Sequence, residues 1–411
     1  MTINNEHKKL NVPNLRFPEF QGEWEKCKLG ELTTKVGSGS TPKGGNAVYT
    51  SVGHCFVRSQ NVGMGYLILD DIAHIDDDIH QKHKATELSE DDVLLNITGA
   101  SIGRTAIATK EIEGGNVNQH VCIIRANSKV SPKFLCNYIQ TKKIQNYIRS
   151  LQTGGSREGL NFDQIRSFPI SLPSIAEQNK IAQLLDKLNE RIATQNKIID
   201  KLQSLIKGLN DALYAQHGDE VMTSFAELGT SYSGLSGKSA QDFGSGKPFI
   251  TYLNVYSNNV INENDFQYVA IKDGEKQNIV EYGDVLFTLS SETPNEVGIG
   301  SVYLGKEKVY LNSFCFGIHI TNTKVAFSPY LSYYVSSTAF RKFIYPYAQG
   351  STRFNLCKAD FEKASIKLPT LENQKRIYSI LSHIDNKIIT ERQMHDLYNS
   401  QKQYLLRQMF I

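Results

Sequence analysis

The feature that most constrains the fold of this chain is an internal repeat at an offset of 196 residues, which loosens toward the start of each half. The segment GGSREGL at residues 154–160 returns as GSTRFNL at 350–356, and ISLP at 170–173 returns as IKLP at 366–369. The correspondence continues into a run of regularly spaced apolar residues that opens with a glutamine in both halves. Because a repeat of this length indicates a tandem duplication, we expect two similar domains in the 411 residues.

Each half ends in a stretch whose apolar residues alternate four and three positions apart, over more than four heptads in the first half. This spacing is typical of a long helix that buries one stripe against another helix. The second stretch keeps the register and turns polar in its middle. The predicted coiled-coil seam consists of Ile181, Leu185, Leu188, Ile192, Ile199, Leu202, Ile206, Leu209, Leu213, Ile377, Leu381, Ile384, Ile388, Tyr398, Leu405 and Met409.

The order of the elements along the chain predicts how these helices pair. The first helix leaves the first domain and enters the second, and the second helix has no other partner for its stripe. If the two pack together, the second must run antiparallel to the first. The alternative is two unrelated amphipathic helices, each lying on its own globular core.

The predicted fold is α+β: two similar mixed α/β domains separated by an antiparallel coiled coil of two long helices, in a pseudo-twofold tandem repeat. Short β-branched and aromatic runs between Gly- and Asn-rich loops predict strands at 93–97, 121–124 and 285–288. Ser131-Pro132 and Ser328-Pro329 predict the start of a helix in each half. The expected boundaries are an N-terminal extension at 1–20, a first domain at 21–175, a central helix at 176–217, a second domain at 218–373 and a C-terminal helix at 374–411.

Composition argues against several classes of protein. The six cysteines are scattered without a CxxC pair, which argues against a disulfide framework and a zinc site. No run of 18 apolar residues occurs and the first residues are polar, so we expect a cytoplasmic protein with no membrane segment. The net charge of +3 permits nucleic-acid binding without requiring it.

The distribution of charge is more informative than its sum. Residues 129–157 and the equivalent residues 324–358 contain several Lys and Arg and no acidic residue. Tyrosines are interleaved with these charges, at Tyr138 and Tyr147 in the first block and at Tyr345 and Tyr347 in the second. We interpret the two basic blocks as a surface that faces phosphates. The alternative is a solvated helix face whose aromatic residues are buried.

No catalytic or metal-binding constellation is evident. The chain lacks the Asn-Pro-Pro-aromatic motif of amino-methyltransferases and a glycine fingerprint after a strand. Gly237-Lys238-Ser239 imitates the end of a phosphate-binding loop, but Tyr232 stands where that loop needs a glycine. His80 and His83 are expected to be solvated loop residues and not metal ligands.

Four short signatures in order along the chain resemble the specificity subunits of type I restriction-modification systems. They are STPK at 40–43, TGASIG at 98–103, NQH at 118–120 and LPxxxxQ at 172–178, and the resemblance covers essentially the whole chain. It implies a non-catalytic subunit whose two target-recognition domains each read one half of a bipartite double-stranded DNA site. The coiled coil would set the spacer and dock the methyltransferase (modification) subunits, and restriction/translocase subunits would complete the complex. This chain would bind no cofactor, whereas the partner subunits would use S-adenosylmethionine, ATP and Mg.

The residues expected to contact DNA are amides, hydroxyls, cationic groups and one carboxylate in the loops that carry these signatures or align with them. In the first domain they are Ser40, Thr41, Lys43, Ser59, Gln60, Asn61, Thr98, Ser101, Arg104, Gln119, His120 and Arg157. In the second they are Lys238, Tyr252, Asn254, Ser290, Ser291, Glu292, Asn312, Ser313 and Arg353.

Two other classes of function stay open on the sequence alone. A free-standing transcriptional regulator would also need paired readers, although no helix-turn-helix signal is present. A coiled-coil scaffold with protein-binding heads would explain the helices but not the repeated basic blocks. Co-purification separates the three, because methyltransferase and translocase chains should accompany only a specificity subunit.

Overall fold

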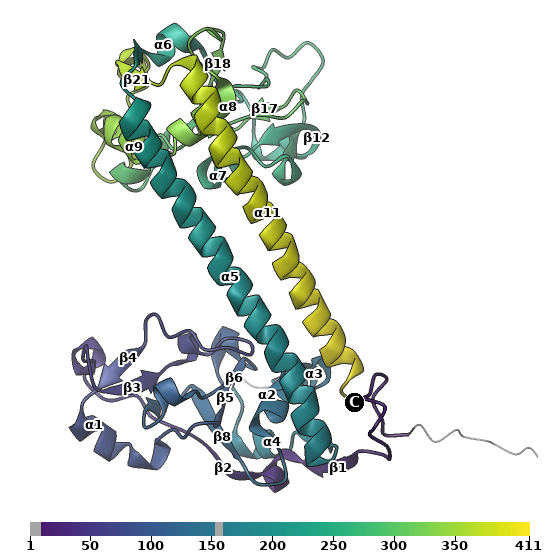
Figure 1. The fold of residues 1–411 in the computed structure, drawn as a ribbon. Coiled ribbons are helices and arrows are strands. Elements are labelled where there is room, and N and C mark those ends of the chain that lie inside the picture. The colour runs from purple at the N-terminus through teal and green to yellow at the C-terminus, as the bar shows by residue number, and fades with distance from the viewer. Residues whose placement is uncertain (1–9, 153–158) are drawn as a thin grey trace, which may run out of the picture. The chain divides into compact units, whose positions relative to one another are not determined.

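The computed structural model describes residues 10–152 and 159–411 (Figure 1). The chain divides into two compact units, one of Met1–Asn196 with Gln393–Ile411 and the other of Lys197–Arg392. Each unit contains one globular α/β domain. Each also contains part of the two long helices, α5 (Ile175–His217) and α11 (Leu371–Gln408).

The first domain is built on a four-stranded antiparallel sheet in the order β2-β8-β5-β6. A three-stranded sheet, β4-β3-β7, lies in the same domain, and β1 pairs with β9 where the chain enters and leaves it. The strands are β1 (Glu25–Lys28), β2 (Thr33–Ser38), β3 (His54–Val57), β4 (Ala73–Ile75), β5 (Val93–Asn96), β6 (Thr105–Ile107), β7 (Asn116–Val117), β8 (Val121–Ala126) and β9 (Pro169–Leu172). The α-helices are α1 (Asp77–Lys82), α2 (Pro132–Gln140), α3 (Lys142–Ser150) and α4 (Phe162–Arg166).

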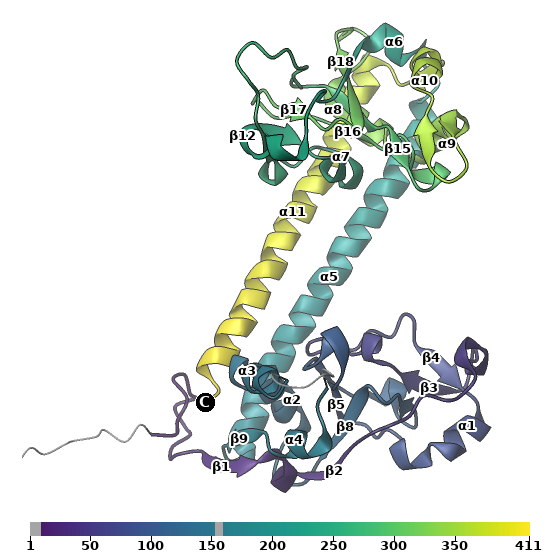
Figure 2. The same ribbon diagram turned by 180° about the vertical axis from the view of Figure 1, so that it is seen from behind.

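The second domain repeats this topology (Figure 2). Its sheets have the orders β11-β18-β14-β16 and β13-β12-β17, β10 pairs with β21, and a small sheet β15-β20-β19 is added. The strands are β10 (Val221–Thr223), β11 (Gly229–Ser233), β12 (Phe243–Ile250), β13 (Gln267–Val269), β14 (Val285–Thr288), β15 (Ser290–Ser291), β16 (Gly300–Val302), β17 (Tyr310–Leu311), β18 (Cys315–Ile320), β19 (Ala348–Gln349), β20 (Phe354–Leu356) and β21 (Ile366–Leu368). The α-helices are α6 (Phe225–Leu228), α7 (Tyr252–Ser257), α8 (Ser328–Tyr334), α9 (Thr338–Ile344) and α10 (Lys358–Lys363).

The shared strand order confirms the prediction of two similar mixed α/β domains. The three predicted strands correspond to β5, β8 and β14, and every residue of β5 and β14 is buried, as expected for central strands covered on both faces. The Ser-Pro pairs do mark helix starts, because Pro132 and Pro329 both lie in a first turn. Ser131, however, makes no side-chain capping bond, and α8 already begins at Ser328.

The predicted seam residues are all buried or half-buried. In the first unit, Leu185 near the start of α5 and Leu405 near the end of α11 belong to the same hydrophobic cluster as Phe134 of α2. In the second unit, Leu381 near the start of α11 belongs to the cluster around Phe287, and residues from the last part of α5 pack against that cluster. The helices are therefore antiparallel, as predicted. Neither they nor any other helix within residues 10–152 and 159–411 is long and apolar enough to cross a membrane.

A buried glutamine joins the first long helix to the first domain. Gln178 of α5 accepts a hydrogen bond through Oε1 from the Ser131 backbone N–H, at 2.8 Å, where α2 begins. Its Nε2 donates to the carbonyls of Lys129, at 3.1 Å, and Pro173, at 2.9 Å. One side chain thus pairs three backbone groups, and two of these hydrogen bonds are fully buried.

The repeat reproduces this arrangement in the second domain. Gln374 of α11, which aligns with Gln178, accepts from the Phe327 backbone N–H at 2.8 Å. It donates to the carbonyls of Val325 and Pro369, both at 2.8 Å. The glutamine of the LPxxxxQ signature therefore has a structural role in both halves: it fixes the start of a long helix against the start of a domain helix. We call the two arrangements the glutamine clamps.

We expect Gln178→Ala to lower the free energy of unfolding of the first unit by about 2–3 kcal/mol, because it leaves buried backbone groups unpaired. The measurement is native-state hydrogen exchange, with the Ser131 amide as the reporter of the clamp. Gln183→Ala, an exposed glutamine on the same helix, is the matched control and should change neither quantity. Unchanged protection of the Ser131 amide in Gln178→Ala would contradict this account of the clamp.

Candidate nucleic-acid interface

Three loops of the first domain bring four predicted residues together. Thr41 follows β2, Thr98 follows β5, and Gln119 and His120 lie between β7 and β8. The Thr41 hydroxyl donates to Gln119 Oε1, and Gln119 Nε2 lies 3.1 Å from His120 Nε2. Because an amide nitrogen only donates, His120 Nε2 accepts, and His120 Nδ1 then donates to the Thr98 hydroxyl. We call these four partly exposed residues the polar chain.

The loop that carries Gln119 and His120 is held by a buried asparagine. Asn118 Oδ1 accepts from the His120 backbone N–H at 3.0 Å. The Asn118 backbone N–H donates to the Val57 carbonyl, also at 3.0 Å. These two bonds fix the loop to the end of β3, so the polar chain is presented in a defined geometry.

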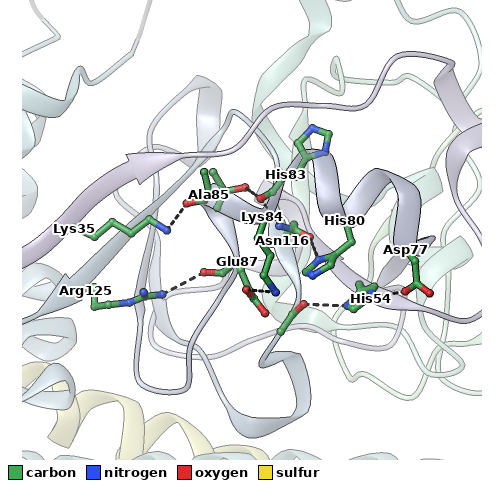
Figure 3. A network of polar contacts seen from close by, with 12 residues as sticks. Lys35, His54, Asp77, His80, His83, Lys84, Ala85, Glu87, Asn116 and Arg125 are labelled. Atoms are coloured by element: carbon green, nitrogen blue, oxygen red, sulfur yellow. Dashed lines mark hydrogen bonds and ion pairs between the residues drawn. The ribbon is translucent and has the colours of Figure 1, made fainter.

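A histidine network supports the loop that precedes Thr41 (Figure 3). His80 of α1 is buried and stacks on His54 of β3, with ring centroids 3.7 Å apart. His80 Nδ1 lies 2.8 Å from Asn116 Oδ1, and the Asn116 amide donates to the His83 carbonyl. His83 Nε2 lies 2.9 Å from the Ser40 hydroxyl. The expectation of a solvated His80 is therefore wrong, because its ring packs on a second imidazole. No group of three or more His, Cys, Asp or Glu residues in the described part of the chain could hold a metal ion.

A buried aspartate precedes the central strand of each domain and ties it to a neighbouring strand. Asp92 accepts from Arg125 Nε and Nη2, both at 2.7 Å, and these hydrogen bonds raise the pKa of Arg125. Asp284 instead accepts from the Tyr232 hydroxyl at 2.7 Å and lies 2.8 Å from His319 Nδ1. Burial raises the pKa of Asp284. The aspartate before the central strand is thus paired with an arginine in the first domain, and with a tyrosine and a histidine in the second.

The remaining predicted contacts of the first domain lie in nearby loops and short turns. Lys43, Gln60 and Arg104 are exposed, whereas Ser59 and Ser101 are half-buried. Gln60 Nε2 donates to Asp71 Oδ2 at 3.3 Å. Arg157 lies outside the described residues.

Two predicted asparagines are structural. Asn61 is buried, accepts from the Arg58 backbone N–H at 2.9 Å and donates to the Ile68 carbonyl at 2.9 Å. Asn254 is also buried and donates to the Asn262 carbonyl at 2.9 Å. Their amides are used to hold local turns, so neither is kept in the set of contacts proposed below.

Lys238 is likewise used inside the second domain. Its ammonium group forms an ion pair with Glu275 at 2.5 Å and donates to the Ala270 carbonyl at 2.6 Å. The side chain is only 6% exposed, and the hydrogen bond holds the pKa of Glu275 at about 2. Because its ammonium group is already paired inside the domain, Lys238 is not available to bind a phosphate.

The second domain has a counterpart of the loop that carries Gln119 and His120. Asn312 Oδ1 accepts from the Phe314 backbone N–H at 2.9 Å, which is the bond that Asn118 makes to His120. The Phe314 carbonyl accepts from the Leu289 N–H at 2.9 Å, and the His120 carbonyl accepts the equivalent bond from the residue after β5 at 3.0 Å. Phe314 therefore occupies the position of His120, and the exposed Ser313 occupies that of Gln119.

Five predicted residues of the second domain line one hollow of about 460 Å³: Tyr252, Ser290, Ser291, Glu292 and Arg353. Leu253, Tyr256, Glu296 and Phe314 complete its lining. These four residues are not among those expected from the sequence to contact DNA. The signal that could have identified Phe314 is the asparagine two positions before it, Asn312, which matches Asn118 two positions before His120.

The two basic blocks only partly support the interpretation as a phosphate-facing surface. Tyr138 is fully buried in the core, and Lys143 donates to the Ile411 carbonyl at 2.9 Å. In the second block, Arg341 donates to the carbonyls of Asn295, Val297 and Gly298. Burial lowers the pKa of Arg341. For Tyr138 and Arg341 the prediction is wrong, because the ring of the first and the charge of the second stabilise the domain.

Comparisons with known proteins agree with this architecture. A sequence model of the family described as the type I restriction modification DNA specificity domain matches residues 21–204 and 233–396. The MjaX type I restriction enzyme specificity subunit of Methanocaldococcus jannaschii is 23% identical over 418 residues, which cover 94% of this chain and 92% of the relative.

Two solved structures share the fold. One is a chain from a type I restriction-modification system solved to explain complex assembly, with a TM-score of 0.56, 18% identity, and coverage of 93% of this chain and 96% of that one. The other is the S subunit from M. genitalium, with a TM-score of 0.55, 13% identity, and coverage of 97% and 99%. The chain therefore belongs to the type I restriction-modification specificity family, and it is a DNA specificity subunit.

Proposed function

We propose that each globular domain reads one half of a bipartite site in double-stranded DNA. The observation that carries this proposal is the pair of equivalent loops, residues 118–120 and 312–314, which share their backbone hydrogen bonds and differ in their exposed side chains. A common scaffold with different side chains at the same place is what two readers of different base sequences require.

In the first domain, the polar chain supplies the chemistry for direct readout. A glutamine amide can bond bidentately to adenine, and hydroxyl and imidazole groups can bond to base edges or phosphates. The other proposed contacts of this domain are Ser40, Lys43, Ser59, Gln60, Ser101 and Arg104, together with Arg157, which lies outside the described residues. In the second domain they are Tyr252, Ser290, Ser291, Glu292, Asn312, Ser313 and Arg353.

The long helices are proposed to dock the methyltransferase (modification) subunits. Outside the seam, α5 exposes Leu184, Ile198 and Leu205, whose spacing in whole heptads places them on one stripe. The repeat places Ile380 and Met394 of α11 at the positions of Leu184 and Ile198, and both are exposed. Two equivalent apolar stripes fit two copies of one partner.

Catalysis belongs to the partner subunits of such a complex, and a specificity subunit is not itself an enzyme. S-adenosylmethionine, ATP and Mg are therefore assigned to the methyltransferase and restriction/translocase subunits, which act with this chain on cytoplasmic DNA. Methylation-sensitive sequencing of DNA from cells with and without this chain tests the proposal. A bipartite methylated motif should disappear when the chain is removed, and methyltransferase and translocase chains should co-purify with it.

The two domains should read independently. Replacing residues 21–175 with the matching domain of a relative should change one half of the methylated motif and leave the other half intact. Sequencing of methylated DNA from cells that carry the hybrid measures this directly. If both halves of the motif changed together, modular reading would be refuted.

Gln119→Ala should weaken binding to the cognate site by roughly 10- to 100-fold, because a good side-chain pair with a base is worth about 1–3 kcal/mol of discrimination. The loss should be accompanied by relaxed preference at one position of the first half-site. Gln81→Ala, an exposed glutamine on α1, is the matched control and should behave as the unaltered protein. A uniform loss of affinity for all sequences would make Gln119 a phosphate contact and not a reader.

We also propose that the helices set the number of unread base pairs between the half-sites. Inserting one heptad after Ile199 and one after His395 keeps both seams in register and adds about 10 Å of helix. At about 3.4 Å per base pair, the methylated motif should gain one to three spacer base pairs, since bending and twisting of DNA can absorb part of the change. An active variant with the original spacer would show that the helices do not determine the separation. Insertion in one helix alone breaks the register and is the control.

A further inference from the structure

Phe314 occupies the position that His120, a proposed DNA contact, has in the first domain. His120 joins the polar chain, whereas the Phe314 ring has no polar group and is 56% exposed. Both loops hold the residue's backbone through the same two hydrogen bonds, so the point from which the ring projects is fixed. If this loop contacts DNA, as proposed above, an exposed aromatic ring at this point suits an apolar ligand group.

The surroundings of Phe314 define the shape of that ligand. Leu253, 67% exposed, and the half-buried Tyr252 line the same hollow as the ring. Side chains that line a hollow receive a protruding group, whereas a wedge between base pairs must itself protrude. The hollow can therefore receive a group that stands out from the DNA surface, and Phe314 and Leu253 are the apolar side chains that such a group would meet.

The charged residues of the hollow indicate which part of DNA reaches it. The Arg353 guanidinium lies 6.0 Å from the centre of the Phe314 ring and can contact a phosphate or a guanine. Glu292 is exposed, and its carboxylate repels phosphates but accepts from an amino group on a base edge. A rim with both charges matches the edges of base pairs in the major groove better than the phosphate backbone alone.

We propose that the second domain recognises a thymine by its 5-methyl group, which packs on Phe314 and Leu253. This inference rests on the proposed reading of one half-site by this domain. The thymine methyl is the apolar group that base pairs present in the major groove, and phenylalanine is a residue type that contacts it. The two domains then differ in kind: the first reads hydrogen-bonding groups through the polar chain, and the second adds an apolar contact.

Thymine-to-uracil replacement tests the proposal, because it removes only the methyl group. The half-site of the second domain is the half of the methylated motif that survives exchange of the first domain. Duplexes with single uracils in that half are titrated with the full chain in complex with its modification subunits. One position should show about fourfold weaker binding, as expected for burial of one methyl group.

The Phe314→Ala variant completes a double-mutant cycle. It should lose most of the thymine preference at that position, because only Leu253 still contacts the methyl group, whereas Phe314→Leu should keep a preference for thymine. Tyr282→Ala, an exposed aromatic outside the hollow, is the matched control and should keep the fourfold preference. Uracil substitutions in the other half-site should respond identically in all variants.

Three results would overturn the proposal: a second half-site without thymine, equal binding of every uracil duplex by the unaltered chain, or an unchanged thymine preference in Phe314→Ala. A loss of affinity in Phe314→Ala that is equal for thymine and uracil at every position would indicate stacking on a base instead. If the unaltered complex did not prefer the bipartite motif over unrelated DNA, the proposed function itself would fail. The comparison of the bipartite motif with unrelated DNA, made before any uracil is introduced, detects that failure.

Discussion

Two buried amides, Gln178 and Gln374, fix the relation between the long helices and the domains that they serve. Each is itself buried and pairs one backbone N–H and two carbonyls. Because an unpaired buried polar group costs about 1–3 kcal/mol, a helix cannot rotate or slide at this point without losing several such bonds at once. The helix start is therefore coupled to the domain helix that packs on the central sheet, and the sheet in turn places the loops that carry the candidate contacts.

In both domains, the residues that hold the loops in place are distinct from the exposed residues proposed to contact DNA. Asparagines that hold the backbone keep their role between the halves: Asn118 and the half-buried Asn312 hold equivalent loops, and the buried Asn61 and Asn254 hold equivalent turns. Exposed positions diverge, as His120 and Phe314 show. This division has a physical basis, since a buried amide loses several hydrogen bonds when it is replaced, whereas an exposed residue can change with little effect on stability. The same scaffold can thus present different chemistry to DNA.

Much of the fold was predictable from the sequence, but much less of the candidate site was. Strand positions, the antiparallel helices and the seam follow from periodicity and from the repeat, which are properties of neighbouring residues. The contacts were chosen by residue type, and type does not reveal whether a side chain is free. Lys238 is bound to Glu275, Arg341 caps three carbonyls, and His80 is buried against His54. In each case the partner is distant along the chain and close only after folding.

The order of the residues alone establishes the duplication, the two α/β domains and the two heptad helices, because repeats and heptads are patterns along the chain. The resemblance to specificity subunits rests on four short signatures. Tertiary structure decided which polar and aromatic side chains remain available for a ligand. Folding brings Thr41, Thr98, Gln119 and His120 together from three loops. It buries Asn61 and Asn254 and leaves Phe314 exposed in a hollow. The physical reason is that the exposure of a side chain depends on the partners that folding brings to it, and neither composition nor spacing records those partners.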